Sequence, residues 1–101
     1  MKTFQVSLSK KSLRNIREIG DHIREDAPEA AERICDELLA SIRSLAHLPA
    51  RNVQVGVSRK RGFPIHRLVN HPYNIYYRIE TDVVFVLMVR HGMRRPPTRF
   101  E

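Results

Sequence analysis

Two amphipathic helical segments with almost no chain between them limit the fold of this protein more than any other feature of its sequence. Apolar residues recur every three or four positions over residues 9–26 and again over residues 27–47, and Pro49 stops the second segment. The two apolar stripes contain Leu13, Ile16, Ile19 and Ile23, and then Ile34, Leu38, Leu39, Ile42 and Leu45. Because the helices follow one another directly, they must pair as an antiparallel hairpin.

Both helices begin with a capping signal. Ser9 can accept a hydrogen bond from a first-turn amide of the first helix. Asp26 stands before the second helix, with Glu29 at capping-box spacing and Pro28 in a first turn, where its missing N–H costs nothing. We therefore expect Ser9 and Asp26 to cap the two helices.

Strand patterns flank the hairpin. Four strands are predicted, over residues 2–8, 63–70, 73–80 and 82–90. Residues 49–62 contain Pro, Gly and three consecutive cations, which predicts a loop with room for a short extended piece at residues 53–57. The prediction is a single domain over residues 1–101 of the α+β class, in which an N-terminal strand and an antiparallel helix hairpin pack on a small, mainly antiparallel sheet.

The last two predicted strands differ in their patterns. Residues 73–80 alternate, with Tyr73 and Tyr77 on the apolar face, whereas residues 83–89 are apolar at every position, which is typical of a strand buried on both faces. One hairpin can cover only one face of the sheet. We expect the other face to be covered by the basic tail, residues 91–101, by a second copy of the chain or by a partner protein. The alternative is a face that stays half-exposed.

The positive charge lies in one half of the chain. The net charge is +7, yet residues 1–50 hold eight Lys or Arg against eight Asp or Glu, while residues 51–101 hold ten against three. Such a one-sided excess attracts an acidic partner, either protein or nucleic acid.

The cysteine content predicts a protein of a reducing compartment, and the histidine spacing predicts that it has no metal site. A single cysteine, Cys35, cannot form an internal disulfide, and no apolar N-terminal run is present, so we expect a cytoplasmic protein without a membrane span. The spacing of the five histidines suggests no metal site, and no cofactor is expected.

Three phrases of the sequence, taken in order, resemble a known bacterial family. They are DAPEAAER at residues 26–33, YNIYYRIE at residues 73–80 and VRHGMR at residues 89–94. With the order strand, hairpin, loop and three strands, they resemble the ParE branch of the RelE/ParE superfamily, toxins of type II toxin–antitoxin systems of the plasmid-stabilisation kind. The resemblance implies a growth-inhibiting toxin that binds DNA gyrase, is not an enzyme and is neutralised by a ParD-like antitoxin. Asn74 stands where many relatives have an arginine.

Charge and resemblance together predict two sets of contact residues. The target-binding set is Arg59, Lys60, Arg61, Arg90, Arg94 and Arg95. These cations form one patch if the loop folds over the strand ends. The antitoxin-binding set is Arg67, Tyr76 and Arg78, on the face of the sheet away from the helices. Direct nucleic-acid binding is less favoured, because few aromatic residues that could stack on bases lie near the cations.

Two other functions stay open. A ribosome-dependent mRNA endoribonuclease of the RelE type would use Arg61, Arg67 and Arg78 to hold the phosphate, with His91 as its acid or base. No carboxylate or second histidine is expected beside His91, which favours a structural role for this residue at the strand end. The second alternative is a non-toxic, antitoxin-binding regulatory relative.

Overall fold

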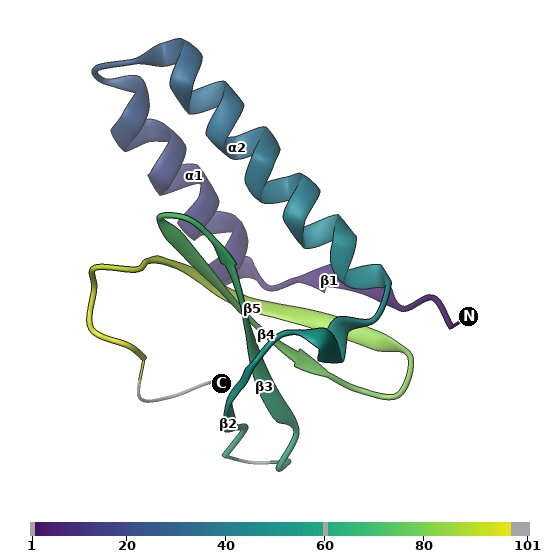
Figure 1. Cartoon of the computed structure of the whole chain (residues 1–101). Helices are drawn as coiled ribbons and strands as arrows, with labels where there is room; N and C mark the ends of the chain where they lie inside the picture. The colour runs from purple at the N-terminus through teal and green to yellow at the C-terminus, as the bar shows by residue number, and fades with distance from the viewer. Residues whose placement is uncertain (1, 60, 98–101) are drawn as a thin grey trace.

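A helical hairpin and a five-stranded sheet form two layers in the computed structural model, which describes residues 2–59 and 61–97 (Figure 1). The elements are β1 (Gln5–Leu8), α1 (Lys10–Arg24), α2 (Pro28–Arg43), β2 (Gln54–Val57), β3 (Pro64–Asn70), β4 (Tyr73–Ile79) and β5 (Val83–His91). Two short 3₁₀ turns, η1 (Ser44–Ala46) and η2 (Pro49–Arg51), connect α2 to β2. The predicted α+β class is confirmed.

The strand order across the sheet is β1-β5-β4-β3-β2. β2, β3, β4 and β5 pair antiparallel, and only β1 runs parallel to its neighbour, β5. The prediction of a mainly antiparallel sheet is therefore confirmed. The parallel pair is possible because α1 and α2 lie between β1 and the rest of the sheet in the sequence and provide the long connection that parallel strands need.

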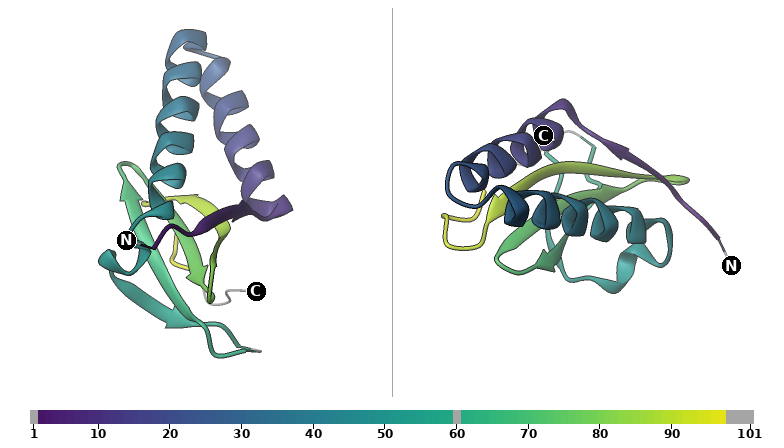
Figure 2. Two further views of the ribbon diagram at one scale, coloured as in Figure 1. Left: turned by 90° about the vertical axis from the view of Figure 1, so that its right-hand side faces the viewer. Right: turned by 90° about the horizontal axis from the view of Figure 1, so that it is seen from above.

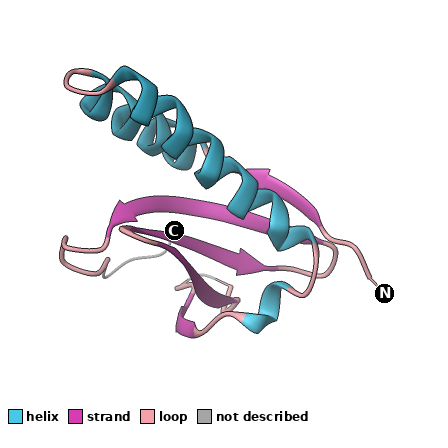
Figure 3. Ribbon diagram, turned by 45° about the horizontal axis from the view of Figure 1, so that its top comes forward, coloured by secondary structure: helices cyan, strands magenta, loops and turns pink. Residues whose placement is uncertain are grey.

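The hairpin covers one face of the sheet, as Figure 2 and Figure 3 show, and its tip projects beyond the strands. Helix residues Ile16, Leu38 and Ile42 meet strand residues of β4 and β5 in the main core. The strand side of this core consists of Tyr73, Ile75, Tyr77, Val84, Val86 and Val89. The alternation in residues 73–80 therefore predicted correctly which face of β4 packs against the helices.

The capping predictions had different outcomes. The Ser9 side chain accepts a hydrogen bond from the Ser12 amide at 3.0 Å, as expected. The prediction for Asp26 was wrong: Ala27 occupies the N-cap position of α2, without a side-chain hydrogen bond. The reason is that the Asp26 amide still bonds to the Ile23 carbonyl at 3.1 Å, so this residue belongs to the closing turn of α1. Leu13, expected on the apolar stripe, is also half-exposed.

The segment predicted as a loop is more ordered than expected. α2 ends at Arg43 rather than at residue 47, and residues 49–62 contain both η2 and the edge strand β2. The extended piece at residues 53–57 is therefore a strand in the sheet. A buried group holds the segment in place: the Tyr77 hydroxyl donates to the Pro49 carbonyl and accepts from the Asn52 amide, at 3.0 Å from its nitrogen.

The first strand is shorter than predicted. β1 begins at Gln5, because the residues before it pair with the end of the hairpin instead. Thr3 forms an isolated bridge with His47, and the Phe4 amide bonds to the Ala46 carbonyl at 2.8 Å.

The face of the sheet away from the helices has its own buried residues. A bulge at Leu87 shifts the register, so that Tyr76 pairs with Met88 and Tyr77 with Val86. Ile65 on β3 shares this face, since it pairs with Arg78 of β4. Ile65, Tyr76 and Met88 are all at most 4% exposed within the single chain. These three residues are therefore buried without a second copy of the chain or a partner protein, two of the three covers that the sequence predicted. Residues 92–97 turn away from the hairpin after β5 (Figure 1).

Candidate functional site

The last five residues of β5 have no strand beside them on one edge. β1 pairs with β5 only from Val83 to Val86, because the chain leaves the sheet at Leu8 and turns into α1. β5 itself continues to His91. An open strand edge presents backbone groups that need partners, and such an edge can accept another chain.

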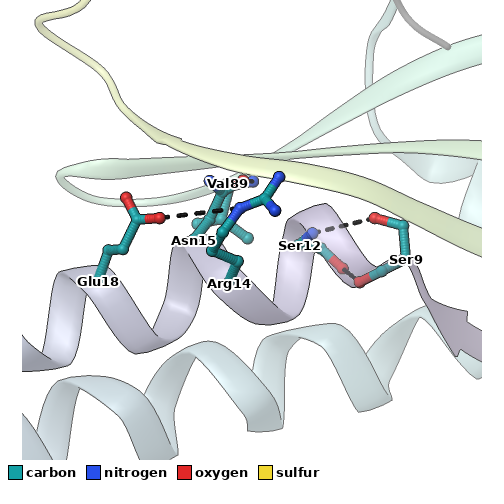
Figure 4. Close-up of polar contacts among 6 residues, drawn as sticks. All are labelled: Ser9, Ser12, Arg14, Asn15, Glu18 and Val89. Atoms are coloured by element: carbon teal, nitrogen blue, oxygen red, sulfur yellow. Dashed lines mark hydrogen bonds and ion pairs between the residues drawn. The ribbon is translucent and has the colours of Figure 1, made fainter.

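Side chains of α1 take the place of the missing strand (Figure 4). The Ser9 hydroxyl donates to the Leu87 carbonyl at 2.9 Å. Asn15 accepts a hydrogen bond from the Val89 amide through its side-chain oxygen, at 3.1 Å. α1 therefore packs along the open half of β5 and satisfies it with two polar side chains.

A groove lies between α1 and this half of β5, and we refer to it as the α1–β5 groove. It consists of two hollows, of about 380 and 190 Å³, which share Asn15, Val89, Arg90 and Arg94. The other lining residues are Lys11, Glu18, Ile19, His22, Tyr73, Met88 and His91. The groove thus has an apolar floor and charged walls. Burial raises the pKa of the Tyr73 phenol in this floor.

The charge of the groove is positive. Its lining residues, all within the described part of the chain, include the cations Lys11, Arg90 and Arg94 against one carboxylate, Glu18. That carboxylate lies 3.9 Å from the guanidinium of Arg14, and both side chains are more than 60% exposed. An exposed pair of this kind contributes little to stability and is easily rearranged. The groove therefore favours an anionic ligand.

Glu18 and His22 also correct the prediction that no carboxylate or second histidine lies near His91. Both come from α1 and line the same hollow as His91. In the described residues no hydrogen bond or ion pair joins these three side chains to one another. His91 instead accepts the Met93 amide at 3.0 Å through its Nδ1 and meets the Tyr73 ring edge-on, with centroids 5.5 Å apart. These contacts stabilise the end of β5.

Of the other predicted catalytic residues, only Arg67 lies near His91, whereas Arg61 and Arg78 lie towards the opposite end of the sheet. Arg78 pairs with Glu80 at 2.8 Å and stacks over the Phe85 ring at 4.7 Å, so it is already engaged within the chain. Arg67 lines a separate hollow of about 330 Å³ with Asn74 and His91, and its Nε is buried without a hydrogen-bond partner among the described residues. Arg61 is exposed in the turn before β3. The structure brings Arg67 and His91 together, and leaves Arg61 and Arg78 apart from them.

The predicted target-binding cations form two groups rather than one patch. Arg59 and Arg61 lie in the turn between β2 and β3, at the level of the start of β5 but on the far side of β4, whereas Arg90, Arg94 and Arg95 lie at and beyond the end of β5. The seven residues of β4 separate the two groups by roughly 20 Å. Lys60 lies outside the described residues. The loop does not fold over the strand ends, because β2 pairs it to the outer edge of the sheet.

The predicted antitoxin-binding residues are mostly enclosed. Tyr76 is 4% exposed, and Arg78 is half-buried between aromatic rings. Sequence reasoning missed Lys11, Asn15 and Glu18, which line the groove. The available signal was Asn15, a polar residue that interrupts the buried side of α1 next to Ile16.

The described residues contain neither a metal-binding cluster nor a membrane-spanning helix. Over residues 2–59 and 61–97, no group of three or more His, Cys, Asp or Glu side chains is placed to hold a metal ion. Neither helix in these ranges is long and apolar enough to cross a membrane.

Comparison with solved structures defines the class of fold. A chain of the chromosomal ParDE toxin–antitoxin system of Pseudomonas aeruginosa matches 88% of this chain and 96% of its own length, with a TM-score of 0.68 and 16% identity. A chain of the archaeal RelE–RelB complex of Pyrococcus horikoshii matches 92% and 99%, with a TM-score of 0.65 and 14% identity. The fold is that of the RelE/ParE toxins.

Sequence comparison identifies the branch. The family described as "ParE toxin of type II toxin-antitoxin system, parDE" matches residues 6–96. A protein of Sinorhizobium fredii named "Putative toxin Y4kP" is 33% identical over 87 residues, which cover 86% of each chain. The chain belongs to the ParE toxin family of type II toxin–antitoxin systems.

Proposed function

We propose that this protein is a cytoplasmic toxin that inhibits DNA gyrase by binding and is silenced by a cognate ParD-like antitoxin. The observation that supports binding most directly is the group of cations at the end of β5. Arg94 and Arg95 are exposed, and Arg90 is half-exposed. Within the described residues, Glu18 is the one carboxylate that lines the groove with Arg90 and Arg94. Such a surface attracts an acidic protein and steers its approach.

Binding accounts for the geometry better than catalysis does. Cleavage of RNA needs an acid, a base and phosphate-holding cations directed at one point. Of the four residues proposed for that chemistry, Arg78 is occupied by Glu80 and two aromatic rings, and Arg61 lies in a distant turn. The Nδ1 of His91 is occupied by a backbone amide. These contacts support a non-enzymatic toxin.

An antitoxin partner is supported by the relatives. The matching structures from Pseudomonas aeruginosa and Pyrococcus horikoshii are a ParDE toxin–antitoxin system and a RelE–RelB complex. A net charge of +7 on 101 residues makes an acidic antitoxin segment the complementary partner.

The test compares two activities of the purified chain, each with and without antitoxin. Supercoiling by purified gyrase is measured against increasing toxin, and mRNA integrity is measured in a translating extract. We expect loss of supercoiling or accumulation of cleaved DNA, reversed by antitoxin, with mRNA intact. Cut mRNA with unaffected gyrase contradicts the proposal and supports the RelE-type alternative; His22→Ala and His91→Ala then test whether the groove is catalytic. No effect in either assay, with antitoxin still bound, supports the non-toxic relative.

A further inference from the structure

We infer that the hollow beside Arg67 receives one acidic side chain of the target protein, an aspartate or a glutamate. This hollow, of about 330 Å³, lies on the face of the sheet away from the helices, and we refer to it as the Arg67 hollow. The inference rests on the proposed function, because it names a contact between the toxin and the protein that it inhibits. It gives Arg67 a role in target binding, which neither the predicted antitoxin-binding set nor the RNA-cleavage alternative gave it.

The first argument is an unpaired nitrogen. Arg67 pairs with Tyr76 across β3 and β4, so its side chain lies on the face away from the helices. Its Nε is buried, and among the buried side-chain nitrogens and oxygens of the described residues it alone lacks a hydrogen-bond partner. A buried polar group without a partner costs free energy, and the cost is larger for a charged group. A carboxylate that accepts from this guanidinium offsets the cost, because the planar fork of arginine matches its two oxygens.

The second argument is the charge of the lining. No Asp or Glu is among the described residues that line the Arg67 hollow, so no carboxylate of the chain's own competes there for the guanidinium. The polar groups beside Arg67 are the Asn74 amide and the His91 ring. By contrast, Arg78 on the same face is already paired with Glu80. Arg67 is therefore available to an anion from outside the chain.

The third argument is the shape of the hollow. The Gly92 amide donates to the Pro72 carbonyl at 2.7 Å, which fixes the chain after β5 against the β3–β4 turn. A Cβ atom at Gly92 would lie 3.1 Å from that carbonyl oxygen, so the two segments are in close contact. Val69 and Met93 add apolar walls and are 56% and 88% exposed. The hollow thus offers apolar contact to the methylene groups of an acidic side chain, and the unbranched Met93 can adjust to it.

The fourth argument is the position of the hollow. Gly92 and Met93, which line it, directly precede Arg94 and Arg95, the exposed cations proposed for target binding. A protein that contacts these two cations is therefore within reach of the hollow. The long-range attraction of the cations and the anchoring of one carboxylate then act on the same partner.

A protein side chain fits the Arg67 hollow better than a nucleic acid does. A nucleic-acid strand binds through a row of cations and through exposed aromatic rings that stack on its bases. Arg67 is the one Lys or Arg among the described lining residues, and the neighbouring Tyr76 is only 4% exposed.

The first experiment measures inhibition of gyrase supercoiling by the full-length chain. Val69→Glu places a carboxylate at the rim of the hollow, where it repels an acidic side chain and competes for Arg67. Val57→Glu is the matched control, because Val57 is similarly exposed, at 53%, and lies on β2 outside the hollow. We expect the concentration for half-inhibition to rise about tenfold for Val69→Glu and to change less than about twofold for Val57→Glu. Thermal unfolding checks that both variants are folded.

The second experiment removes the cation itself. Arg67→Gln is compared with Arg43→Gln, which removes an exposed cation of α2 as a charge-matched control. We expect Arg67→Gln to weaken inhibition by at least about tenfold, because a hydrogen bond between charged groups is lost. The melting temperature of the free chain should not fall, since the Arg67 Nε has no partner there among the described residues. Antitoxin affinity, measured by titration calorimetry, should change less than about threefold in all four variants.

The outcomes separate this inference from the proposed function. If the wild-type chain does not inhibit gyrase, the proposed function fails and the inference fails with it. If the wild-type chain inhibits, the inference requires weaker inhibition by both Val69→Glu and Arg67→Gln, or by Val69→Glu alone where Arg67→Gln does not fold. Inhibition equal to wild type in either folded variant overturns the inference and leaves the proposed function standing.

Two further results assign the Arg67 hollow to a different partner. An equal loss of antitoxin affinity in both hollow variants places the hollow in the antitoxin interface. Cleavage of mRNA in a translating extract by the wild-type chain, but not by Arg67→Gln, identifies a nucleic-acid site. Either result overturns the inference.

Discussion

At the scale of single residues, Gly20 lies at a close contact between the two helices. A Cβ atom at this position would lie 2.9 Å from the Cys35 sulfur and 3.4 Å from the guanidinium of Arg24. The arginine is flexible, but Cys35 packs against the main core of the protein. The absence of a side chain therefore allows α1 and α2 to meet here.

We predict that Gly20→Ala lowers the free energy of unfolding by about 1–2 kcal/mol, because crowding against Cys35 outweighs the better helix propensity of alanine. Denaturant unfolding measures the change. In a Cys35→Ala background the same substitution should become neutral or stabilising, since the contact is gone. Equal destabilisation in both backgrounds contradicts the assignment of the effect to this contact.

Tyr77 supports a second prediction, which concerns pH. Its ring is fully buried and stacks on His66 with centroids 5.6 Å apart, and its hydroxyl holds the segment that precedes β2. Burial raises the pKa of this phenol above its usual value, and the hydrogen bond from Asn52 opposes the shift. The neutral phenol therefore stabilises the fold, fully so below the ordinary pKa of about 10 and less as the pH rises through the folded value.

We predict that Tyr77→Phe lowers the free energy of unfolding by about 1–2 kcal/mol at neutral pH, because the Asn52 amide and the Pro49 carbonyl lose their partner. Above about pH 10 the wild-type protein should lose stability faster than the variant, which has no phenol to ionise at this position. Urea unfolding at a series of pH values tests both parts. Parallel pH profiles would mean that ionisation elsewhere, such as at Tyr73 or Cys35, dominates the alkaline loss.

At the scale of elements, the start of α1 links the hairpin to the sheet. The Ser9 hydroxyl accepts from the Ser12 amide, as Figure 4 shows, and it also donates to the Leu87 carbonyl, so one side chain caps α1 and satisfies the edge of β5. The Ser9 amide also bonds to the Val86 carbonyl at 3.0 Å. The angle between α1 and β5, and with it the shape of the groove, depends on these contacts.

We predict that Ser9→Ala destabilises the protein by about 1–2 kcal/mol, the cost of losing an N-cap together with a partner of Leu87. Thermal or denaturant unfolding measures the loss. Ser44→Ala is the control, because that hydroxyl makes only exposed hydrogen bonds, to the Ser41 carbonyl and from the Arg51 guanidinium, and should matter less than about 0.5 kcal/mol. Equal losses in the two variants would contradict the linking role of Ser9.

At the scale of the whole molecule, the described cations of the predicted target-binding set lie in two groups, separated by the length of β4. The group at the end of β5 is the denser one, since Arg90, Arg94 and Arg95 are joined there by Lys11 of α1. A partner that binds this group covers the α1–β5 groove as well.

We predict that Arg94→Gln/Arg95→Gln raises the concentration needed for half-inhibition of gyrase about tenfold, whereas Arg59→Gln/Arg61→Gln changes it less than about twofold. The supercoiling assay measures both variants at the same ionic strength. The opposite ranking would assign target binding to the β2–β3 turn and separate it from the groove.

The sequence alone determined the elements and their class. The two helical stripes, the cap at Ser9 and the apolar face of β4 are all local patterns, because periodicities of about 3.6 and 2 residues follow from backbone geometry. The family resemblance rested on phrases within these same elements. The prediction for Asp26 failed because only three residues, Glu25 to Ala27, separate the two helices, and the Asp26 amide is used in the closing turn of α1.

Only the tertiary structure decided which polar and charged side chains lie on the same surface. Asn15 and Val89 are 74 positions apart, and they meet because β1 pairs parallel to β5 and directs α1 along its open edge. The same pairing brings Glu18 and His22 to His91, while the antiparallel order of β3, β4 and β5 sends Arg61 and Arg94 to opposite ends of the sheet. Strand order and register are long-range properties that local periodicity does not encode, so the groove could be found only in the folded chain.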